Sequence, residues 1–486
     1  MNEPLEIELK LELASPDQVR LNLADLVASG NGGTKSLIST YFDTPDQSLR
    51  KAGYSLRVRE AGGRFVQTVK AEKDAAAGLY VRPEWEGDIP RITPVLDNAG
   101  PLMDVLGRET LDMVARAFVT EVERRVQKIE CGGATILVAD DCGEIRAGRH
   151  VEPIREVELE LERGDPKAIF KLARRINEEM PVRLGVRSKS ERGHNLLDRK
   201  KQKAFKAEPV NLSPTDSTEA AFAKIAQSCI RQFRLNETLL LTTGTPAPLH
   251  QARVGLRRLR SAFSIFSPLF ADDAEARRLR AELRWLAQTL GPVRDLDVLG
   301  ASLSGPDQDA VAARRETAFA EAMEDVDSAR TRLLMLDLAE WLAFGDWRQK
   351  AKKHKVLDAE IGEAARAILR KRRKKLKRNG HDLIDLPDEE RHELRKEAKK
   401  LRYATEFFAT IFADEPARSG HRLFSEKLQK LQDDLGELND LAARPKLLSE
   451  LGFSGDVQPA TQNRDELLAK AHQDFLELVA LDPFWR

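Results

Sequence analysis

The sequence has little cysteine and no long apolar run. Its 486 residues contain three cysteines, Cys131, Cys142 and Cys229, with no close pair among them. This argues against a disulfide framework or a thiolate zinc site. No window approaches the run of about 18 uncharged apolar residues that a membrane helix needs. The start, MNEPLEIELKLEL, lacks the basic segment and apolar run of a secretory signal, so we expect a cytoplasmic protein.

Net charge is also absent. The chain carries 79 Lys and Arg residues against 79 Asp and Glu residues. This balance excludes a generally basic nucleic-acid coat or an acidic tail protein. Charged residues nevertheless make up 33% of the chain, above the usual value of about 25%. The informative feature is therefore the local segregation of charge.

The chain has two parts with different patterns. Residues 1–200 hold 17 of the 29 glycines. Period-2 alternation there predicts strands, at 6–13, 54–60, 64–72, 79–87, 134–140 and 155–162, with helices near 16–28 and 166–179. From 216 onward apolar residues recur at helical spacing. We expect an α+β domain at 1–200, a polar linker at 201–215 and an all-α domain at 216–486.

In the predicted strands the polar positions are almost purely ionic. Glu6, Glu8 and Lys10 share one strand face, and Ile7 and Leu9 share the other. Because successive side chains in a strand alternate, each ionic set converges on one surface. The further sets are Arg57 and Arg59; Thr68 and Lys70; Arg82, Glu84 and Glu86; and Glu156, Glu158, Glu160 and Glu162.

Two arrangements fit this pattern, an open sheet with a salt-bridged outer face or a closed barrel with an ionic lumen. Clustered acids repel one another unless a cation lies between them, and clustered bases need a polyanion. Acids for a divalent metal and bases for phosphate are what a triphosphate site requires. The signs therefore favour the barrel. His150 and His194 are isolated, and we expect each to be a surface or structural residue.

The charged elements resemble one known family. The run Glu6-Ile-Glu-Leu-Lys10 is similar to the ExExK signature of the CYTH superfamily, which contains class IV adenylyl cyclases, thiamine triphosphatases and inorganic triphosphatases, also called triphosphate tunnel metalloenzymes. The similarity covers about residues 1–200 and implies an eight-stranded antiparallel β-tunnel. Further elements follow in the family order: Arg57-Val-Arg59, Thr68-Val-Lys70, Arg82-Pro-Glu-Trp-Glu86, Arg124, Asp141-Cys-Gly143, Glu156-Val-Glu-Leu-Glu160 and Ser188-Lys189.

The resemblance implies a role for each charged position, with Glu6, Glu8 and Lys10 as catalytic residues. Phosphate oxygens would be bound by Lys10, Arg57, Arg59, Lys70, Arg82, Arg124 and Lys189. One or two Mg²⁺ or Mn²⁺ ions would be held by Glu6, Glu8, Asp141, Glu156, Glu158 and Glu160. Which two of the last three are ligands stays open, because all have the same parity. Arg125 could replace Arg124 if the register shifts by one residue.

The helical part contains an internal repeat. His250-Gln-Ala-Arg253-Val-Gly-Leu-Arg257-Arg-Leu-Arg260 matches His392-Glu-Leu-Arg395-Lys-Glu-Ala-Lys399-Lys-Leu-Arg402 at an offset of 142. The spacing places the four basic positions of each copy on one helix face. Residues 366–378 hold nine bases and no acid. Among them, the candidates for binding a polyanion are Arg370, Arg373, Lys374 and Lys377. A polyanion, or acids from neighbouring helices, must relieve the repulsion.

This repeated basic pattern resembles the CHAD domain, the conserved histidine α-helical domain, over about residues 216–486. The resemblance implies two pseudo-symmetric four-helix bundles that bind inorganic polyphosphate through the twelve positions just named, and association with polyphosphate granules. Lys399 stands where the first copy has an arginine, and a lysine cannot fork onto phosphate. Aromatic residues are 6% and do not interleave with the basic stripes, which disfavours nucleic acid.

Together the two halves predict a metal-dependent inorganic triphosphatase that hydrolyses tripolyphosphate to diphosphate and phosphate. A water, activated by a second metal or a glutamate base, would attack a terminal phosphorus in line. The alternatives are a nucleoside or thiamine triphosphatase, a class IV adenylyl cyclase, or a non-catalytic polyphosphate-binding scaffold. The fused polyphosphate-binding pattern and the lack of an evident adenine or thiamine pocket favour tripolyphosphate.

Overall fold

The computed structural model describes residues 5–14, 33–72, 77–98, 100–198, 204–301, 303, 305–348, 359–450 and 464–486. The helix expected near 16–28 and residues 201–203 of the expected linker lie outside these ranges. The chain forms two compact units. The first comprises Met1–Lys206, Gln227–Leu256 and Glu275–Gly345, and the second comprises Ala207–Ala226, Arg257–Ala274 and Asp346–Arg486.

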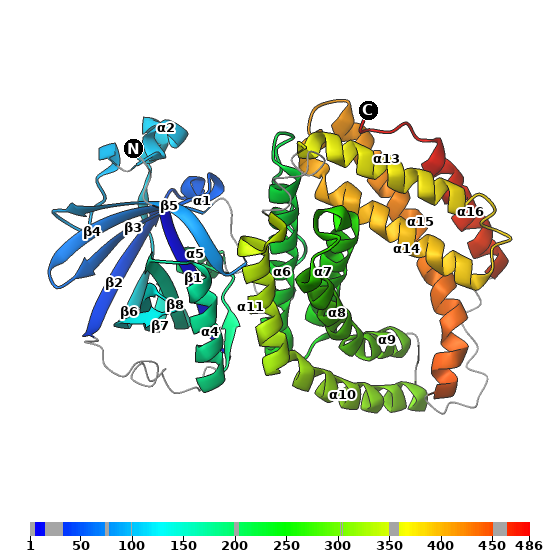
Figure 1. Ribbon diagram of the computed structural model, residues 1–486, viewed down its shortest axis with the longest axis horizontal. Helices are drawn as coiled ribbons and strands as arrows, with labels where there is room; N and C mark the ends of the chain where they lie inside the picture. Colours follow the sequence, from blue (N-terminus) through cyan, green and yellow to red (C-terminus); the bar gives the residue numbers. More distant parts are fainter. Residues whose placement is uncertain are drawn as a thin grey trace. The chain divides into compact units, whose positions relative to one another are not determined.

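Eight antiparallel strands close into a barrel (Figure 1). The strands are β1 (Leu5–Leu13), β2 (Gly33–Asp43), β3 (Tyr54–Ala61), β4 (Arg64–Ala71), β5 (Leu79–Ile89), β6 (Ala115–Cys131), β7 (Ala134–Ala147) and β8 (His150–Arg163). Their order is β5-β4-β3-β2-β6-β7-β8-β1, and β1 also pairs with β5. A short strand, β9 (Val182–Leu184), pairs with the end of β1. The expected eight-stranded antiparallel tunnel is confirmed.

Alternation along β3 and β4 sends apolar side chains outward. Leu56 and Val69 pack outside the barrel against Leu49, Leu102 and Leu111, all buried. Those three partners lie on the short helices α1 (Ser48–Lys51), α2 (Leu102–Leu106) and α3 (Arg108–Leu111). A 3₁₀ turn at Leu96–Asn98 precedes α2. Burial of one strand face against helices leaves the opposite, ionic face to line the lumen.

Two further helices belong to the barrel. The first is α4 (Lys167–Glu179), as expected near 166–179, and its buried face includes Ile169, Leu172 and Ile176. The second is α5 (Lys189–Leu197), which contacts β6, β7 and β8. Ser188 caps α5 by accepting a hydrogen bond from the backbone N–H of Glu191. This cap places Lys189 at the first position of the helix.

The region after β9 is helical, with helices α6 (Thr218–Thr243), α7 (Pro246–Ile265), α8 (Ala274–Thr289), α9 (Gly291–Gly300), α10 (Pro306–Val326), α11 (Ala329–Phe344), α13 (Ile361–Asn379), α14 (Asp388–Phe407), α15 (Ala417–Glu450) and α16 (Arg464–Ala480), and 3₁₀ turns at Ser267–Phe270 and Ala409–Phe412. The all-helical C-terminal region is therefore confirmed. The pseudo-symmetry between two four-helix bundles stays a prediction.

The two copies of the repeat lie on different helices, His250–Arg260 on α7 and His392–Arg402 on α14. The helices pack through apolar faces, such as an aromatic cluster of Phe222, Phe263 and Trp347 in the second unit. None of the helices in the described ranges is long and apolar enough to cross a membrane.

Candidate functional site

An ionic cavity lies inside the barrel. Seven acidic and seven basic side chains line it, together with a few hydroxyl and apolar groups, and its empty volume is about 890 Å³. Eleven of the thirteen predicted tunnel residues are in this lining: Glu6, Glu8, Lys10, Arg57, Arg59, Lys70, Arg82, Arg124, Glu158, Glu160 and Lys189. The other two, Asp141 and Glu156, are almost completely buried and bind residues of the lining.

Strand register brings the acids and bases opposite one another. Across the β1–β8 pair, Lys10 faces Glu158 and Glu8 faces Glu160. Glu6 faces Arg82 across the β1–β5 pair that closes the barrel. Residues directly opposite one another on adjacent strands have neighbouring side chains. The ionic faces of separate strands therefore combine into one site.

Lysines and acids form a tight network on one side of the cavity. The Lys10 Nζ lies 3.0 Å from Glu156 Oε1 and 2.6 Å from Glu158 Oε1. The Lys189 Nζ lies 2.7 Å from Asp141 Oδ2 and 2.8 Å from Glu158 Oε1. Burial alone would raise the pKa of Glu156, but the charges of Lys10 and Lys189 outweigh it and lower that pKa to about 2. The same lysines hold the pKa of Glu158 well below its usual range.

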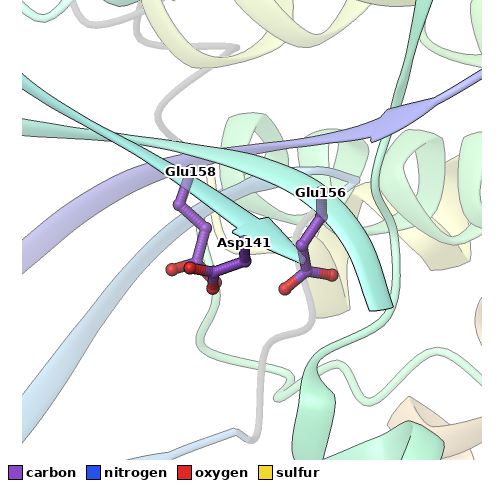
Figure 2. A group of neighbouring side chains, drawn as sticks. All are labelled: Asp141, Glu156 and Glu158. Atoms are coloured by element: carbon purple, nitrogen blue, oxygen red, sulfur yellow. The ribbon is translucent and has the colours of Figure 1, made fainter. Parts of the chain in front are cut away.

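Three carboxylates of this network could hold a metal ion. Asp141 on β7 and Glu156 and Glu158 on β8 each offer an oxygen within 4.8 Å of the others. Figure 2 shows their carboxyl groups pointing to the same side of the sheet. Oxygen ligands of this kind suit Mg²⁺ or Mn²⁺. Their charge is now balanced by Lys10 and Lys189, so a cation here would have to displace an ammonium group.

A second group of acidic side chains, Glu8 and Glu160, lies in surroundings that oppose ionisation. Glu8 is buried, and its Oε1 has no hydrogen-bond partner among the described residues. Burial and the charge of Glu158 raise the pKa of Glu8. Burial, with the charges of Glu6 and Glu8, raises the pKa of Glu160 to about 7. Carboxylates that repel one another in a buried place are stabilised by a cation, so Glu8 and Glu160 offer a second place for a metal ion.

Arg59 is the opposite case, a base with an excess of positive charge around it. The charge of Arg57, then burial and the charge of Arg124, lower the pKa of Arg59 to about 10. The buried Nε of Arg57 has no hydrogen-bond partner within the described ranges. Guanidinium groups that repel one another favour a bound anion, and phosphate oxygens match their geometry.

The register question at Arg124 and Arg125 has a structural answer. Arg124 lines the cavity, and its Nε donates to Asp141 Oδ1 at 2.7 Å. Arg125 Nε donates instead to Asp140 Oδ2 at 3.0 Å. Asp140 alternates with Asp141 along β7, so this pair lies on the other face of the sheet. Arg124 is therefore the arginine that faces the cavity.

The structure adds lining residues that the sequence analysis did not name, among them Tyr41, Ser55, Glu72 and Ser190. Ser55 has the parity of Arg57, and Glu72 has the parity of Lys70. Strict alternation would therefore have found both. Tyr41 and Ser190 carried no such signal, because β2 has no ionic alternation and Ser190 lies on a helix.

His194 has a structural role, as expected. Its Nε2 lies 3.0 Å from Asp43 Oδ2, and its Nδ1 lies 2.9 Å from the Ser190 carbonyl oxygen. Asp43 also accepts hydrogen bonds from the backbone N–H groups of Leu49 and Arg50. His194 thus ties α5 to the turn after β2.

A second basic site lies in the helical region. Arg257 on α7 and Arg395, Lys399 and Arg402 on α14 belong to the second compact unit. Burial, then the charges of Arg395 and Arg257, lower the pKa of Lys399 to about 7. The buried Nε of Arg395 has no hydrogen-bond partner in the part of the chain that the structure describes. Arg257 Nε donates to Tyr403 Oη at 2.6 Å. These side chains again have an excess of positive charge.

The remaining predicted polyphosphate ligands have varied surroundings. Arg370, Lys374 and Lys377 are exposed on α13, and Arg260 is exposed on α7. Arg373 donates to the Val479 carbonyl oxygen at 3.0 Å, at the end of α16.

His392 Nδ1 lies 2.6 Å from Asn439 Oδ1. His250 and Arg253 belong to the first unit, where Arg253 donates to the Ala287 carbonyl oxygen at 3.3 Å.

An acid from a neighbouring helix relieves part of the repulsion on α13. The buried Glu397 of α14 accepts from Lys375 at 3.0 Å and from Arg372 at 3.5 Å. It also accepts from Lys400 at 2.7 Å. The sequence offered two ways to relieve the repulsion, a bound polyanion or acids from neighbouring helices, and these apply to different residues. Arg372 and Lys375 have an acid, whereas Lys399 is surrounded mainly by bases.

Comparison with known proteins gives two family matches. The family model of the CYTH domain matches residues 4–193, and the model of the CHAD domain matches residues 224–449. An inorganic triphosphatase of Haemophilus influenzae is 29% identical over 194 residues, which are 39% of this chain and 54% of that protein. The chain thus spans about half the length of the curated relative it matches.

Two solved structures are similar to parts of the chain. The CHAD domain of the plant Ricinus communis is 27% identical, with a TM-score of 0.46, and covers 58% of this chain and 93% of that one. A Hippeastrum protein described as a candidate adenylyl cyclase with a dominant triphosphatase activity is 19% identical, with a TM-score of 0.32, and covers 41% and 98%. Both TM-scores lie below 0.5, so neither likeness by itself establishes a shared fold.

Proposed function

Because the chain combines a CYTH domain at residues 4–193 with a CHAD domain at residues 224–449, we propose that it is a metal-dependent inorganic triphosphatase with a polyphosphate-binding module. The reaction is hydrolysis of tripolyphosphate to diphosphate and phosphate. Similarity to the Haemophilus influenzae inorganic triphosphatase supports this substrate.

The observation that carries the proposal is the charge arrangement of the cavity. Arg59, which is repelled by Arg57 and Arg124, favours a bound anion, and the repelling acids Glu8 and Glu160 favour a bound cation. Equal numbers of acids and bases in the lining mean that a highly charged anion would enter with compensating cations. A triphosphate with divalent metal ions meets both demands.

The chain's own residues can position and polarise such a substrate. Lys10 stays protonated, since Glu156 and Glu158 overcome the effect of burial and raise its pKa well above the usual value. The guanidinium groups can bind the phosphate oxygens bidentately. A divalent cation, when bound by carboxylates among Glu6, Glu8, Asp141, Glu156, Glu158 and Glu160, would neutralise charge on the triphosphate. Positioning and charge stabilisation account for most catalysis of phosphoryl transfer.

Glu160 has the properties of a general base. Its pKa of about 7 lies close to neutral pH, where proton transfer by a carboxylate is most effective. It lines the cavity from β8, opposite Glu8 on β1. Glu160 could therefore accept the proton of the attacking water when no cation lies between it and Glu8. A cation bound at that place would lower the pKa and make Glu160 a metal ligand instead. Glu6 is less suited to this role, because its carboxylate is paired with the Lys70 Nζ at 2.8 Å.

The cavity lining also favours an inorganic substrate. Its apolar members are Tyr41, Leu137 and Ala139, a small surface for a purine or thiazole ring. Ring systems in binding sites normally lie against larger apolar or aromatic surfaces. Nucleoside and thiamine triphosphates are therefore the second choice.

The helical region is proposed to bind inorganic polyphosphate. The cluster of Arg257, Arg395, Lys399 and Arg402 supports this role, because burial and mutual repulsion there favour a bound polyanion. Bidentate arginine contacts with successive phosphates would supply the affinity.

The first experiment measures phosphate release from tripolyphosphate, ATP and thiamine triphosphate, each with Mg²⁺, Mn²⁺ or EDTA. We expect fast, metal-dependent release from tripolyphosphate and slow release from the other two. Faster release from ATP would identify a nucleoside triphosphatase. Release of diphosphate together with cyclic AMP would identify a cyclase. No turnover of any substrate would leave a binding scaffold, with polyphosphate affinity as its remaining activity.

A further inference from the structure

A short segment between β9 and α5 delivers two residues to the cavity. Ser188 and Lys189 both line it, and the Lys189 Nζ contacts Asp141 and Glu158. Ser188 Oγ also lies 3.2 Å from Oε1 of Glu72, another lining residue. The position of this segment therefore sets the geometry of the cavity around Lys189.

Helix α6 holds this segment, although it belongs to the part of the chain matched by the CHAD model. The Arg234 Nε donates to the Leu184 carbonyl oxygen at 3.0 Å. Arg231 donates to the Val186 carbonyl oxygen and to the Glu191 carboxylate. All these residues lie in the first compact unit. Two arginines of α6 thus bind the backbone on the N-terminal side of Ser188 and a side chain on its C-terminal side.

Burial makes these contacts strong. Arg234 is 1% exposed and Arg231 is 8% exposed. Arg234 is also paired with the buried Glu237 on its own helix. Hydrogen bonds from a buried charged donor are stronger than neutral ones, and loss of a partner leaves a buried group unsatisfied. The segment from Leu184 to Glu191 is therefore held rigidly by α6.

The contact with Glu191 acts on the helix start that presents Lys189. Ser188-Lys-Ser-Glu191 has the spacing of a capping box, and Ser188 does accept from the Glu191 N–H at 3.1 Å. The Glu191 carboxylate is bound by Arg231 of α6. The first turn of α5, with Lys189 in it, is thus tied to α6.

A second observation is that the charge of Arg231 acts on the buried Tyr80. Tyr80 on β5 has the parity of Arg82 and is 4% exposed. The charges of both Arg231 and Glu191 act on the Tyr80 phenol, alongside those of Lys10 and Arg82. The Arg82 guanidinium lies 4.8 Å from the centre of the Tyr80 ring. Arg231 and Arg82 thus both act electrostatically on the same buried phenol.

We propose that Arg231 and Arg234 are positioning residues of the triphosphate site, through which helix α6 of the CHAD region sets the place of Ser188 and Lys189. This inference rests on the proposed function, and it makes the helical region part of the catalytic framework. Misplacement of a substrate-binding group by about 1 Å can cost about 100-fold in rate. A change at Arg231 should therefore act on turnover through Lys189.

A double-mutant cycle in the full chain tests this. We expect Arg231→Met to lower kcat/KM for tripolyphosphate about 10- to 100-fold, and Arg231→Lys to restore part of it. In a Lys189→Met background, Arg231→Met should change kcat/KM less than twofold, because residues that act as a unit are not additive. If Arg231 had a merely structural role, Arg231→Met would lower kcat/KM by the same factor in both backgrounds. Glu191→Gln, which removes the negative charge that Arg231 binds, serves as a second variant should Arg231→Met fail to fold.

Arg174→Met is the matched control. Arg174 on α4 also joins the barrel to the helical region, through Asp337 on α11 at 2.7 Å, but it makes no contact with the 184–191 segment in the described structure. It should leave kcat/KM unchanged. Unchanged activity in Arg231→Met, or an effect that multiplies fully with that of Lys189→Met, would overturn the inference.

The proposed function and this inference fail in different ways. If the wild type hydrolyses tripolyphosphate but Arg231 and Lys189 act independently, only the inference is wrong. If the wild type binds tripolyphosphate without hydrolysing it, the proposed function is wrong. The double-mutant cycle is then measured through the Kd for tripolyphosphate. A wild type that neither hydrolyses nor binds tripolyphosphate would overturn both.

Discussion

At the scale of single residues, the site contains charges whose surroundings oppose their ionised form. Ion pairs such as Lys10 with Glu156 are complete within the chain. Glu8 and Arg59 differ, because their neighbours of like charge and their burial act against the ionised form. Such groups cost stability in the free protein and are typical of places that bind a charged ligand.

Glu8 gives a direct test of the metal-binding face. Glu8→Gln should reduce metal-dependent phosphate release more than about 100-fold, since a neutral amide is a poor ligand for a divalent cation. The fold should persist, because the change removes a buried carboxylate whose Oε1 has no hydrogen-bond partner among the described residues. Glu162→Gln, on the neighbouring strand β8 and paired with Lys128 near solvent, is the control and should keep full activity. Normal turnover in Glu8→Gln would contradict the assignment.

Arg59 should show a trade-off between stability and activity. Arg59→Met removes a charge that Arg57 and Arg124 repel, so we expect about 1 kcal/mol of added stability, or a Tm rise of about 1–2 °C for a unit of this size. Loss of a charged phosphate contact should lower kcat/KM about 10- to 100-fold. Thermal melts and steady-state kinetics on the same preparation measure both. Arg64→Met, at an exposed turn, should change neither. A lower Tm with the lower activity would mean that Arg59 holds the fold.

At the scale of elements, pairing between strands decides which charges meet. β1 contributes Glu6, Glu8 and Lys10, and each faces a different partner on β5 or β8. Hairpin turns help to set that register. The β3–β4 and β6–β7 hairpins turn on Gly62–Gly63 and Gly132–Gly133, all with φ between +58° and +80°, as type I′ turns require.

Helix α14 should bind polyphosphate in a pH-dependent way. The pKa of Lys399 is about 7, so it is cationic below pH 7 and loses its charge as the pH rises through that value. The affinity of the full chain for long polyphosphate should therefore fall up to about tenfold between pH 6 and pH 9, or about 1.4 kcal/mol. Long chains are used because only their terminal groups titrate in this range. Binding isotherms at fixed ionic strength measure the change.

Variants of Lys399 separate the titration of this side chain from a general effect of pH on polyphosphate binding. Lys399→Arg keeps its charge at all these pH values and should flatten the profile. Lys396→Arg, an exposed position on the same helix paired with Glu393, should leave the wild-type profile intact. A profile that stays steep in Lys399→Arg would assign the titration to another group.

At the scale of the whole molecule, the charges that line the cavity are balanced. The two compact units are also not separated at a single position in the sequence. Residues 227–256 and 275–345 of the helical region belong to the same unit as the barrel. Because the lining has equal numbers of acids and bases, it does not favour binding of an anion alone or of a cation alone. Substrate and metal are therefore expected to bind together.

Thermal stability should reveal that coupling. A non-hydrolysable imido analogue of tripolyphosphate alone, or Mg²⁺ alone, should raise the Tm little. Both together, at about 100 times the Kd, should add about 2.7 kcal/mol to the free energy of unfolding. EDTA should reverse the shift. Equal stabilisation by the analogue without metal would show that the arginines suffice and would remove the metal from the binding step.

The strand and helix patterns were largely predictable from the sequence, with instructive exceptions. Strands β1, β3, β4, β5, β7 and β8 and helix α4 follow the expected alternation or helical period. β2 and β6 were not among the strands expected from alternation. Polar side chains point to the outer face as well as the inner one there, as Glu121 and Glu123 do in β6. A strand with polar residues on both faces loses the period-2 signal.

The sequence by itself determined which side chains share a face, because that depends only on the period of the local backbone. It thereby predicted an ionic lumen and the basic stripes of α7 and α14. Only the tertiary structure decided which acid meets which base, that Arg124 rather than Arg125 faces the cavity, and that Glu397 neutralises part of α13. It also decided that α6 holds the segment before α5. These contacts join residues far apart in the chain, and their pairing depends on strand register and helix packing, which no local pattern encodes.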